Sequence, residues 1–222
     1  MYKSKISLPL IFICLLGTHF SFAQNPKNYY VEEPKTFVGG LIAGANFTQV
    51  DGDSYKGYRN IGLSTGVVVY AQLLPQMAAS LEILYSQKGA KSNGPQLSNG
   101  GVTLITKQNI TLNYAEVPIQ LNFFDHKKNH FGAGLSYSQL INSKEVINVN
   151  NPSIKYDPDQ YPFKKMDINL ILSGQLRVYK GLFAGVRFQY SMLSVRDDVD
   201  PVFGRAQQFN NVFAIKMMYL FY

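Results

Sequence analysis

The sequence LNYAEVPIQLNF at residues 112–123 has the pattern of a β-strand with two different faces. From Glu116 onward apolar and polar side chains alternate, which is the two-residue period of a strand. The apolar face holds Val117, Ile119, Leu121 and Phe123, and the polar face holds Glu116, Gln120 and Asn122. Pro118 belongs to the polar phase and cannot donate a ladder hydrogen bond, so we expect a local break or a bulge there.

The same alternation recurs along the chain and predicts eight strands. They span residues 37–50, 59–73, 78–91, 112–123, 131–141, 167–178, 182–192 and 209–221. The connections alternate between long and short, with short turns at 74–76, 125–129 and 180–181 and the longest loop at 143–165. An even number of strands, with short turns at one end and long loops at the other, is typical of a transmembrane β-barrel.

The polar faces of these strands are rich in Gly, Ser, Asn and Gln and hold few charges. Side chains just fill the lumen of an eight-stranded barrel, so we place the polar faces inside and the apolar faces in lipid. Two aromatic girdles support this orientation. The girdle near the short turns comprises Phe123, Phe124, Phe131, Tyr179, Phe183, Tyr219, Phe221 and Tyr222. The girdle near the long loops comprises Phe47, Tyr85, Tyr137, Tyr190 and Phe209.

We therefore predict an all-β fold, an eight-stranded antiparallel up-and-down transmembrane β-barrel with a filled polar lumen. In the last strand, Met217, Tyr219 and Phe221 should face lipid, because the opposite phase would expose Lys216 there at a cost of about 2–4 kcal/mol. The alternative is a secreted soluble β-barrel that binds a hydrophobic small molecule.

The first residues have the three regions of a secretory signal peptide. Lys3 and Lys5 precede an apolar run over residues 6–16, and Ser21-Phe22-Ala23 supplies a small-x-small cleavage site. The run is shorter than the roughly 20 residues of a membrane-spanning helix. We expect a signal peptide at 1–23 cut after Ala23, a flexible periplasmic lead-in at 24–36 and the barrel at 37–222.

Composition excludes several classes of function. The chain of 222 residues has 21 Lys and Arg against 14 Asp and Glu, and its basic residues are scattered, so we expect no nucleic-acid binding. Cys14, the single cysteine, lies in the predicted signal peptide, which leaves no thiol nucleophile. His126 and His130 both lie at a short turn, away from the loops where outer-membrane lipid-modifying enzymes work. We therefore expect no enzyme activity and no cofactor.

Aspartates in the predicted loops are candidates for calcium binding. No twelve-residue calcium loop pattern fits them, so solvated turns are the favoured interpretation and no metal site is expected. These aspartates are Asp51, Asp53, Asp157, Asp159, Asp197, Asp198 and Asp200.

Charged residues on the polar faces are the candidate site. Glu82 and Glu116 lie on neighbouring strands, and a carboxylate buried without a partner in a narrow lumen is costly. We therefore predict a polar network in the lumen that holds the barrel shut, with a path for protons or solutes as the alternative. Its predicted members are Glu82, Lys88, Glu116, Arg177, Arg187 and Lys216.

Two motifs resemble a known family. Residues 81–89, LEILYSQKG, and 114–119, YAEVPI, are similar to the motifs ELLYSQKG and YLEIPLLLK of PorT-like outer-membrane β-barrel proteins. The chain departs from the family at Ala115, Gln120 and Asn122, the last two giving a more polar lumen. The resemblance implies a barrel in the Gram-negative cell envelope and no reaction; one founding member is tied to protein secretion.

The expected role is structural, adhesive or secretion-accessory, carried by the surface loops, chiefly 143–165, or by envelope partners. The expected surroundings are outer-membrane lipid and lipopolysaccharide. We also expect the barrel-assembly machinery to act on the chain during insertion, since its last strand alternates apolar residues up to a terminal aromatic.

Overall fold

The computed structural model describes residues 36–53, 57–92, 94–98, 104–150, 157, 160–198, 200 and 204–221. Within these ranges the chain is almost entirely β-structure. The strands are β1 (Phe37–Asp53), β2 (Asn60–Leu74), β3 (Met77–Lys91), β4 (Gln96–Leu97), β5 (Leu104–Phe124), β6 (His130–Val149), β7 (Met166–Tyr179), β8 (Leu182–Ser191) and β9 (Gly204–Leu220).

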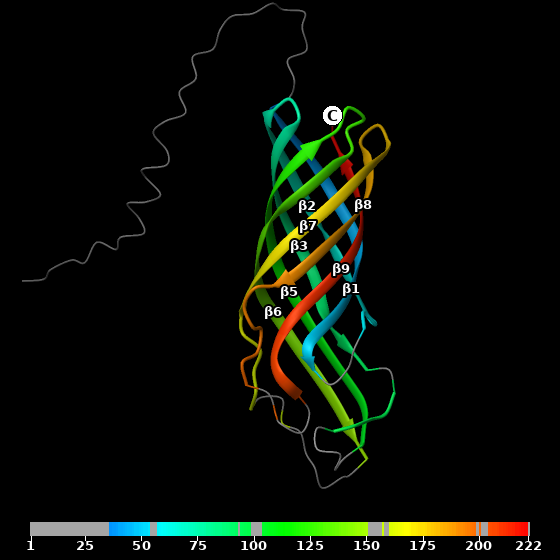
Figure 1. The fold of residues 1–222 in the computed structure, drawn as a ribbon, viewed down its shortest axis with the longest axis vertical. Helices are drawn as coiled ribbons and strands as arrows, with labels where there is room; N and C mark the ends of the chain where they lie inside the picture. The colour runs from blue at the N-terminus through cyan, green and yellow to red at the C-terminus, as the bar shows by residue number, and fades with distance from the viewer. Residues whose placement is uncertain are drawn as a thin grey trace, which may run out of the picture. The chain divides into compact units, whose positions relative to one another are not determined.

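The long strands form a closed antiparallel ring (Figure 1). Its order is β3-β2-β1-β9-β8-β7-β6-β5, and the pairing of β3 with β5 closes it. Of the nine strands described, β4 has two residues and pairs only with β5, so eight strands make the ring. The predicted eight-stranded up-and-down barrel is confirmed. No helix in the described part of the chain is long and apolar enough to cross a membrane.

The barrel turns its apolar face outward. Val67, Ile83, Ile119 and Leu121 keep 46–59% of their surface exposed. Inward side chains between them are buried and mostly polar, among them Asn46, Ser64, Glu116, Gln120 and Gln189. A water-soluble barrel has the opposite arrangement, and an apolar belt of this extent requires lipid. The predicted face assignment is therefore confirmed, and the soluble alternative is wrong.

The last strand follows the predicted phase. Met217 and Tyr219 are about half exposed, whereas Lys216 between them keeps 2% of its surface. The predicted register of the last strand is confirmed up to Phe221, which is also exposed.

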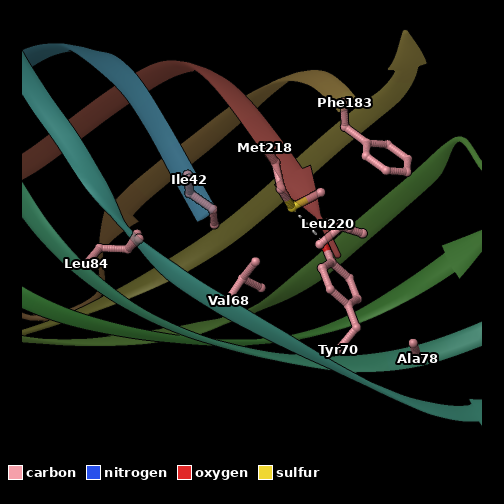
Figure 2. Packing of buried hydrophobic residues seen from close by; sticks show 8 residues of the cluster. All are labelled: Ile42, Val68, Tyr70, Ala78, Leu84, Phe183, Met218 and Leu220. Atoms are coloured by element: carbon pink, nitrogen blue, oxygen red, sulfur yellow. Dashed lines mark hydrogen bonds between the residues drawn. The ribbon is translucent and has the colours of Figure 1, made fainter. Parts of the chain in front are cut away.

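Apolar residues fill the lumen at the end of the short turns (Figure 2). This turn-side cluster comprises Ile42, Val68, Tyr70, Ala78, Leu84, Phe183, Met218 and Leu220, with Val38 and Phe124 packed against it. The predicted polar lumen therefore describes only part of the interior. Phe183, predicted for the outer girdle, is fully buried because it shares the inward phase of Arg187 in β8.

A second apolar cluster fills the lumen toward the long loops. This loop-side cluster contains Val50, Ala90, Ile110, Leu112, Tyr114, Phe163 and Val195. Phe163 and Val195 come from segments predicted as loops, which fold back over the strand ends. The described interior thus has an apolar cluster at each end and polar residues between them.

Several strands are longer than predicted, and β5 and β6 exceed their predicted bounds by the most. β5 begins at Leu104 and β6 ends at Val149, and their pairing runs as far as Ile105↔Val149. The alternation in β5 inverts along its length: Ile110 and Leu112 face inward, whereas Ile119 faces outward. Beyond the bilayer the outer face meets water and the inner face packs on the loop-side cluster, so the apolar phase changes sides.

The pairing of β3 with β5 is interrupted beside Pro118, as predicted. Pairs between β3 and β5 stop at Leu81↔Ile119 and resume at Leu84↔Glu116 in the same register. On the other side Pro118 pairs with Ser136 without a shift, and the register shifts between β5 and β6 lie away from it, at Ile105/Lys107 and Asn113/Tyr114. A break rather than a bulge accommodates the proline.

The turn between β5 and β6 is organised by one carboxylate. Asp125 Oδ1 accepts hydrogen bonds from the backbone N–H groups of Lys127 at 2.8 Å and Asn129 at 2.7 Å, and Oδ2 accepts one from Asn129 Nδ2 at 2.8 Å. Partial desolvation raises the pKa of Asp125, but these hydrogen bonds outweigh it and hold the pKa below its usual range.

Asp125→Ala is therefore expected to lower the urea midpoint of unfolding at neutral pH. Because the pKa of Asp125 is lowered in the folded state, its contribution is present above the ordinary value of 3.8 and is lost as pH falls through the folded pKa. The difference between the two proteins should shrink below about pH 4. A difference that stays constant down to pH 2 would contradict this explanation.

Candidate functional site

Lys88 lies at the centre of the lumen between two carboxylates. Its Nζ is 3.5 Å from Glu116 Oε2 and 3.7 Å from Asp167 Oδ2, and all three side chains are at most 1% exposed. Lys88 also donates to Asn169 Oδ1 at 3.2 Å. One cation from β3 thus joins β5 and β7 across the interior.

A second ion pair lies nearer the short turns. Arg187 Nη2 is 2.5 Å from Glu82 Oε1, joining β8 to β3, and both side chains are 2% exposed. Gln120 donates to the same Glu82 oxygen at 2.9 Å. Lys216 from β9 is equally buried and interacts electrostatically with Glu82 and Glu116.

Neutral side chains complete the environment of these carboxylates. Ser136 donates to Glu116 at 2.9 Å, and Gln189 donates to the same carboxylate. Asn210 donates to Asp167 at 2.9 Å. Three carboxylates and three cations are therefore assembled between the two apolar clusters, and we call this set the charged layer. Its members are Glu82, Glu116, Asp167, Lys88, Arg187 and Lys216.

Five of the six residues selected from the sequence lie in the charged layer, and Arg177 does not. Arg177 is exposed at the end of β7, where its Nε donates to the Lys180 carbonyl at 2.6 Å. It has the inward phase, but a register shift between Arg177 and Tyr179 ends the regular strand there. The assignment of Arg177 to the lumen is wrong.

Asp167 is the member that the sequence analysis missed. It begins the polar phase that continues through Asn169 and Ser173 in β7. This phase was the available signal: Asp167 was predicted as the first residue of the strand at 167–178, on its polar face, but was not included in the predicted network.

The sequence itself matches a known family. The family described as "Outer membrane protein beta-barrel domain" matches residues 22–196. The chain belongs to this family. The protein is therefore an outer-membrane β-barrel, and its exposed apolar belt faces membrane lipid.

Two solved structures are similar to this chain. Ail, the attachment invasion locus protein of Yersinia pestis, is 11% identical, with 83% of this chain and 98% of that chain covered and a TM-score of 0.43. Neisserial surface protein A is 9% identical, with 84% and 97% covered and a TM-score of 0.44. Comparison with curated proteins gives no match.

The loop end of this outer-membrane barrel has its own ion pairs. Arg196 Nη2 is 2.6 Å from Glu145 Oε2, and its guanidinium lies 3.6 Å from the ring centroid of Phe163. Lys164 is 2.7 Å from Asp197, and hydrogen bonds from Lys164 and Ser194 hold the pKa of Asp197 below its usual range.

Two of the aspartates considered as calcium ligands already have partners in the protein. Asp197 is engaged by Lys164, and Asp51 accepts hydrogen bonds from Gln49 and Asn211. In the residues that the structure describes, no group of three or more His, Cys, Asp and Glu side chains is arranged to hold a metal ion. Asp159 lies outside the described residues, and the side chain of Asp53 does too.

The two histidines have different surroundings. His130 is buried, its Nε2 lies 3.0 Å from the Tyr70 hydroxyl, and its ring packs 4.5 Å from that of Phe124 and 5.4 Å from that of Phe183. His126 is exposed in the short turn. His130 therefore joins the β6 end of the barrel to the turn-side cluster.

The layered interior predicts how the purified barrel behaves in a planar bilayer. Because apolar clusters lie on both sides of the charged layer, we expect no stable conductance above the closed baseline. Single-channel recording measures this, with an open porin reconstituted in parallel to show that insertion is detected. Large, long-lived conductance steps would contradict a filled lumen.

Proposed function

We propose that the protein is a docking component of the cell envelope that acts through the loop-side part of β5 and β6. One observation supports this most directly. β6 pairs with β7 only as far as Gln139↔Met166, whereas it pairs with β5 up to Val149. We call residues 141–149 of β6 the projecting edge. In the described part of the chain, this edge has a strand partner on one side only.

A strand edge with a neighbouring strand on one side only is suited to protein docking. Its outward backbone N–H and C=O groups form a template on which an extended segment of a partner adds as a further strand. Side chains along the edge, including Lys144 and Asn148, are exposed. In outer-membrane barrels the long loops face the outside, so a partner there would be extracellular or at the cell surface.

The interior favours docking over transport or catalysis. Lys88 and Arg187 are paired with the three lumen carboxylates between two apolar clusters, and His130 contacts Tyr70 and aromatic rings. This environment supports a structural role for the lumen. An adhesive or a secretion-accessory role is compatible with the same edge.

The finer family assignment belongs to the same proposal. The motifs at 81–89 and 114–119 lie on β3 and β5, and Leu84 pairs with Glu116 across them. Their adjacency supports a PorT-like barrel, in which the pair of motifs forms one section of the wall. We also propose export with cleavage after Ala23, a lead-in at 24–36, and insertion by the barrel-assembly machinery.

Site-specific cross-linking tests the docking proposal. Cys14 is the single cysteine and lies in the proposed signal peptide, so each added cysteine is unique in the mature chain. Lys144→Cys and Asn148→Cys, labelled with a photo-activated cross-linker on intact cells, are expected to give a discrete adduct of higher mass.

Two exposed positions away from the projecting edge serve as controls. Arg59→Cys lies on the loop side before β2, and Gln76→Cys lies in the short turn between β2 and β3. Neither should give the same adduct. Equal labelling from Arg59→Cys, or no adduct from the projecting edge in envelope-replete cells, would contradict docking at this edge.

A further inference from the structure

The lipid-facing wall carries a groove of about 650 Å³ near the short turns. It runs over the outer faces of β6, β7, β8 and β9. Large apolar side chains form its walls, and three small residues, Gly174, Ala184 and Gly185, also line it. The lining side chains used below are Phe131, Gly174, Leu176, Ala184, Val186 and Ile215.

Strand register explains the shape of this groove. Phe131 pairs with Gly174, Gly174 with Val186, and Val186 with Ile215, so one row crosses four strands. In this row Gly174 alone lacks a side chain, and a Cβ built there meets no atom within 4 Å. The adjacent pair, Leu176↔Ala184, repeats the large–small alternation. The small residues form the floor and their neighbours form the walls.

The end of the groove nearest the turns is polar, and the turns that adjoin it are mainly basic. Asp125 and Asn129 line it, and Asn129 Oδ1 accepts a hydrogen bond from the backbone N–H of Arg177 at 2.9 Å. The Arg177 side chain is exposed and is held by the Lys180 carbonyl. Asp125 is the charged residue that lines the groove itself, and the two turns beside it also hold the exposed side chains of Lys127, Lys128 and Lys180, so these turns and Arg177 supply four cations against one carboxylate.

The positions of Gly174 and Arg177 along the membrane normal fit an apolar floor and a basic rim, the rim being the turns at the end of the groove. Gly174 lies three residues before Arg177 on β7, a separation of about 10 Å along a strand. Because barrel strands are tilted by about 35–45°, this is about 7–8 Å along the membrane normal, comparable with the thickness of the headgroup zone. With Gly174 in the outermost hydrocarbon, the Arg177 level would therefore lie among the headgroups.

We propose that this groove is a binding site for one anionic phospholipid of the periplasmic leaflet. An acyl chain lies on Gly174 and Ala184, and the phosphate accepts hydrogen bonds from Arg177 and the turn lysines. The basic rim selects an anionic headgroup over a zwitterionic one, because the four cations exceed the single carboxylate. The site depends on the barrel's membrane location and not on the docking proposal.

Native mass spectrometry of the refolded barrel with added phosphatidylglycerol tests the site. The wild type should retain one lipid, with phosphatidylethanolamine retained about tenfold less well. Gly174→Leu should lose the bound lipid because its side chain fills the floor. Arg177→Gln should weaken phosphatidylglycerol binding about tenfold by removing a charge-assisted hydrogen bond.

Gly39→Leu is the matched control. Gly39 also faces outward near the short turns, on β1, and its added Cβ meets no atom closer than 3.9 Å. This variant should bind lipid like the wild type, and heat-modifiable gel mobility checks that every variant is folded. Equal loss in Gly39→Leu, equal retention of both lipids, or a barrel dimer that Gly174→Leu abolishes would overturn the proposal.

Discussion

Replacing Lys88 with methionine is expected to lower the free energy of unfolding by about 3–5 kcal/mol. Lys88 is the cation that lies between Glu116 and Asp167, and all three side chains are buried. Without it, two carboxylates remain in the lumen with mainly neutral hydrogen-bond donors. Leaving a buried charge unpaired is among the most destabilising single changes in a protein.

Urea titration in lipid vesicles measures this loss. The chain contains no tryptophan, so the folded fraction is best measured by heat-modifiable gel mobility. Lys91→Met is the matched control, because Lys91 is exposed at the end of the same strand, β3. It should change the free energy of unfolding by less than about 0.5 kcal/mol. Equal effects at Lys88 and Lys91 would refute an ion-pair role for the charged layer.

A triple variant distinguishes two causes of the lost stability: the unpaired carboxylates and the lost packing of the lysine side chain. Adding Glu116→Gln and Asp167→Asn to Lys88→Met removes the orphaned charges while nearly preserving side-chain volume. Most of the lost stability should return, because buried ion pairs and well-packed neutral residues are often close in energy. If the triple variant stays as unstable as Lys88→Met, loss of the lysine stem would be the cause.

The main effect of the charged layer is therefore to select one strand register, and its contribution to net stability is smaller. An ion pair taken from water into a lumen loses much of its Coulombic gain to desolvation. Mispairing is costly, however: a strand shifted by one residue would turn Glu116 or Lys216 toward lipid. The Lys88 and Arg187 contacts thus favour one register of β3, β5, β7 and β8 over its neighbours.

The sequence pattern was sufficient for the wall of the barrel. Residues 112–123 alternate because one face meets lipid and the other the lumen, and Lys216 sets the phase of the last strand for the same reason. Alternation does not say where a strand leaves the bilayer. The inward orientation of Ile110 and Leu112 was therefore not predicted, since outside the membrane the apolar phase turns inward.

The interior was predictable only in part. Glu82 and Glu116 were found because a carboxylate on an inward phase demands a partner. Which cations reach them depends on the barrel's width and on strand stagger, which no local pattern encodes. Two wrong assignments show what a local pattern cannot predict. Phe183 was assigned to the outer girdle because it lies close to a turn, and Arg177 was assigned to the lumen by its phase alone.

The second large effect is expected for the pair formed by Glu82 and Arg187. Arg187→Met should lower the free energy of unfolding by about 3–5 kcal/mol, because Glu82 would keep Gln120 but lose its charged partner. Glu82→Gln should cost a similar amount by orphaning the guanidinium. The double variant should be more stable than either single variant, and the double-mutant cycle measures this coupling.

Arg177→Met provides the sharpest comparison for this cycle. It removes the same chemical group from the neighbouring strand, at a position that shares the inward phase but is exposed. Its effect should stay below about 0.5 kcal/mol, and it should show no coupling to Glu82→Gln. If Arg177 and Arg187 proved equally costly to replace, the lumen would extend further toward the turns than the register at Arg177/Tyr179 allows. A large effect at Arg187 alone would place the limit of the charged layer between these two arginines.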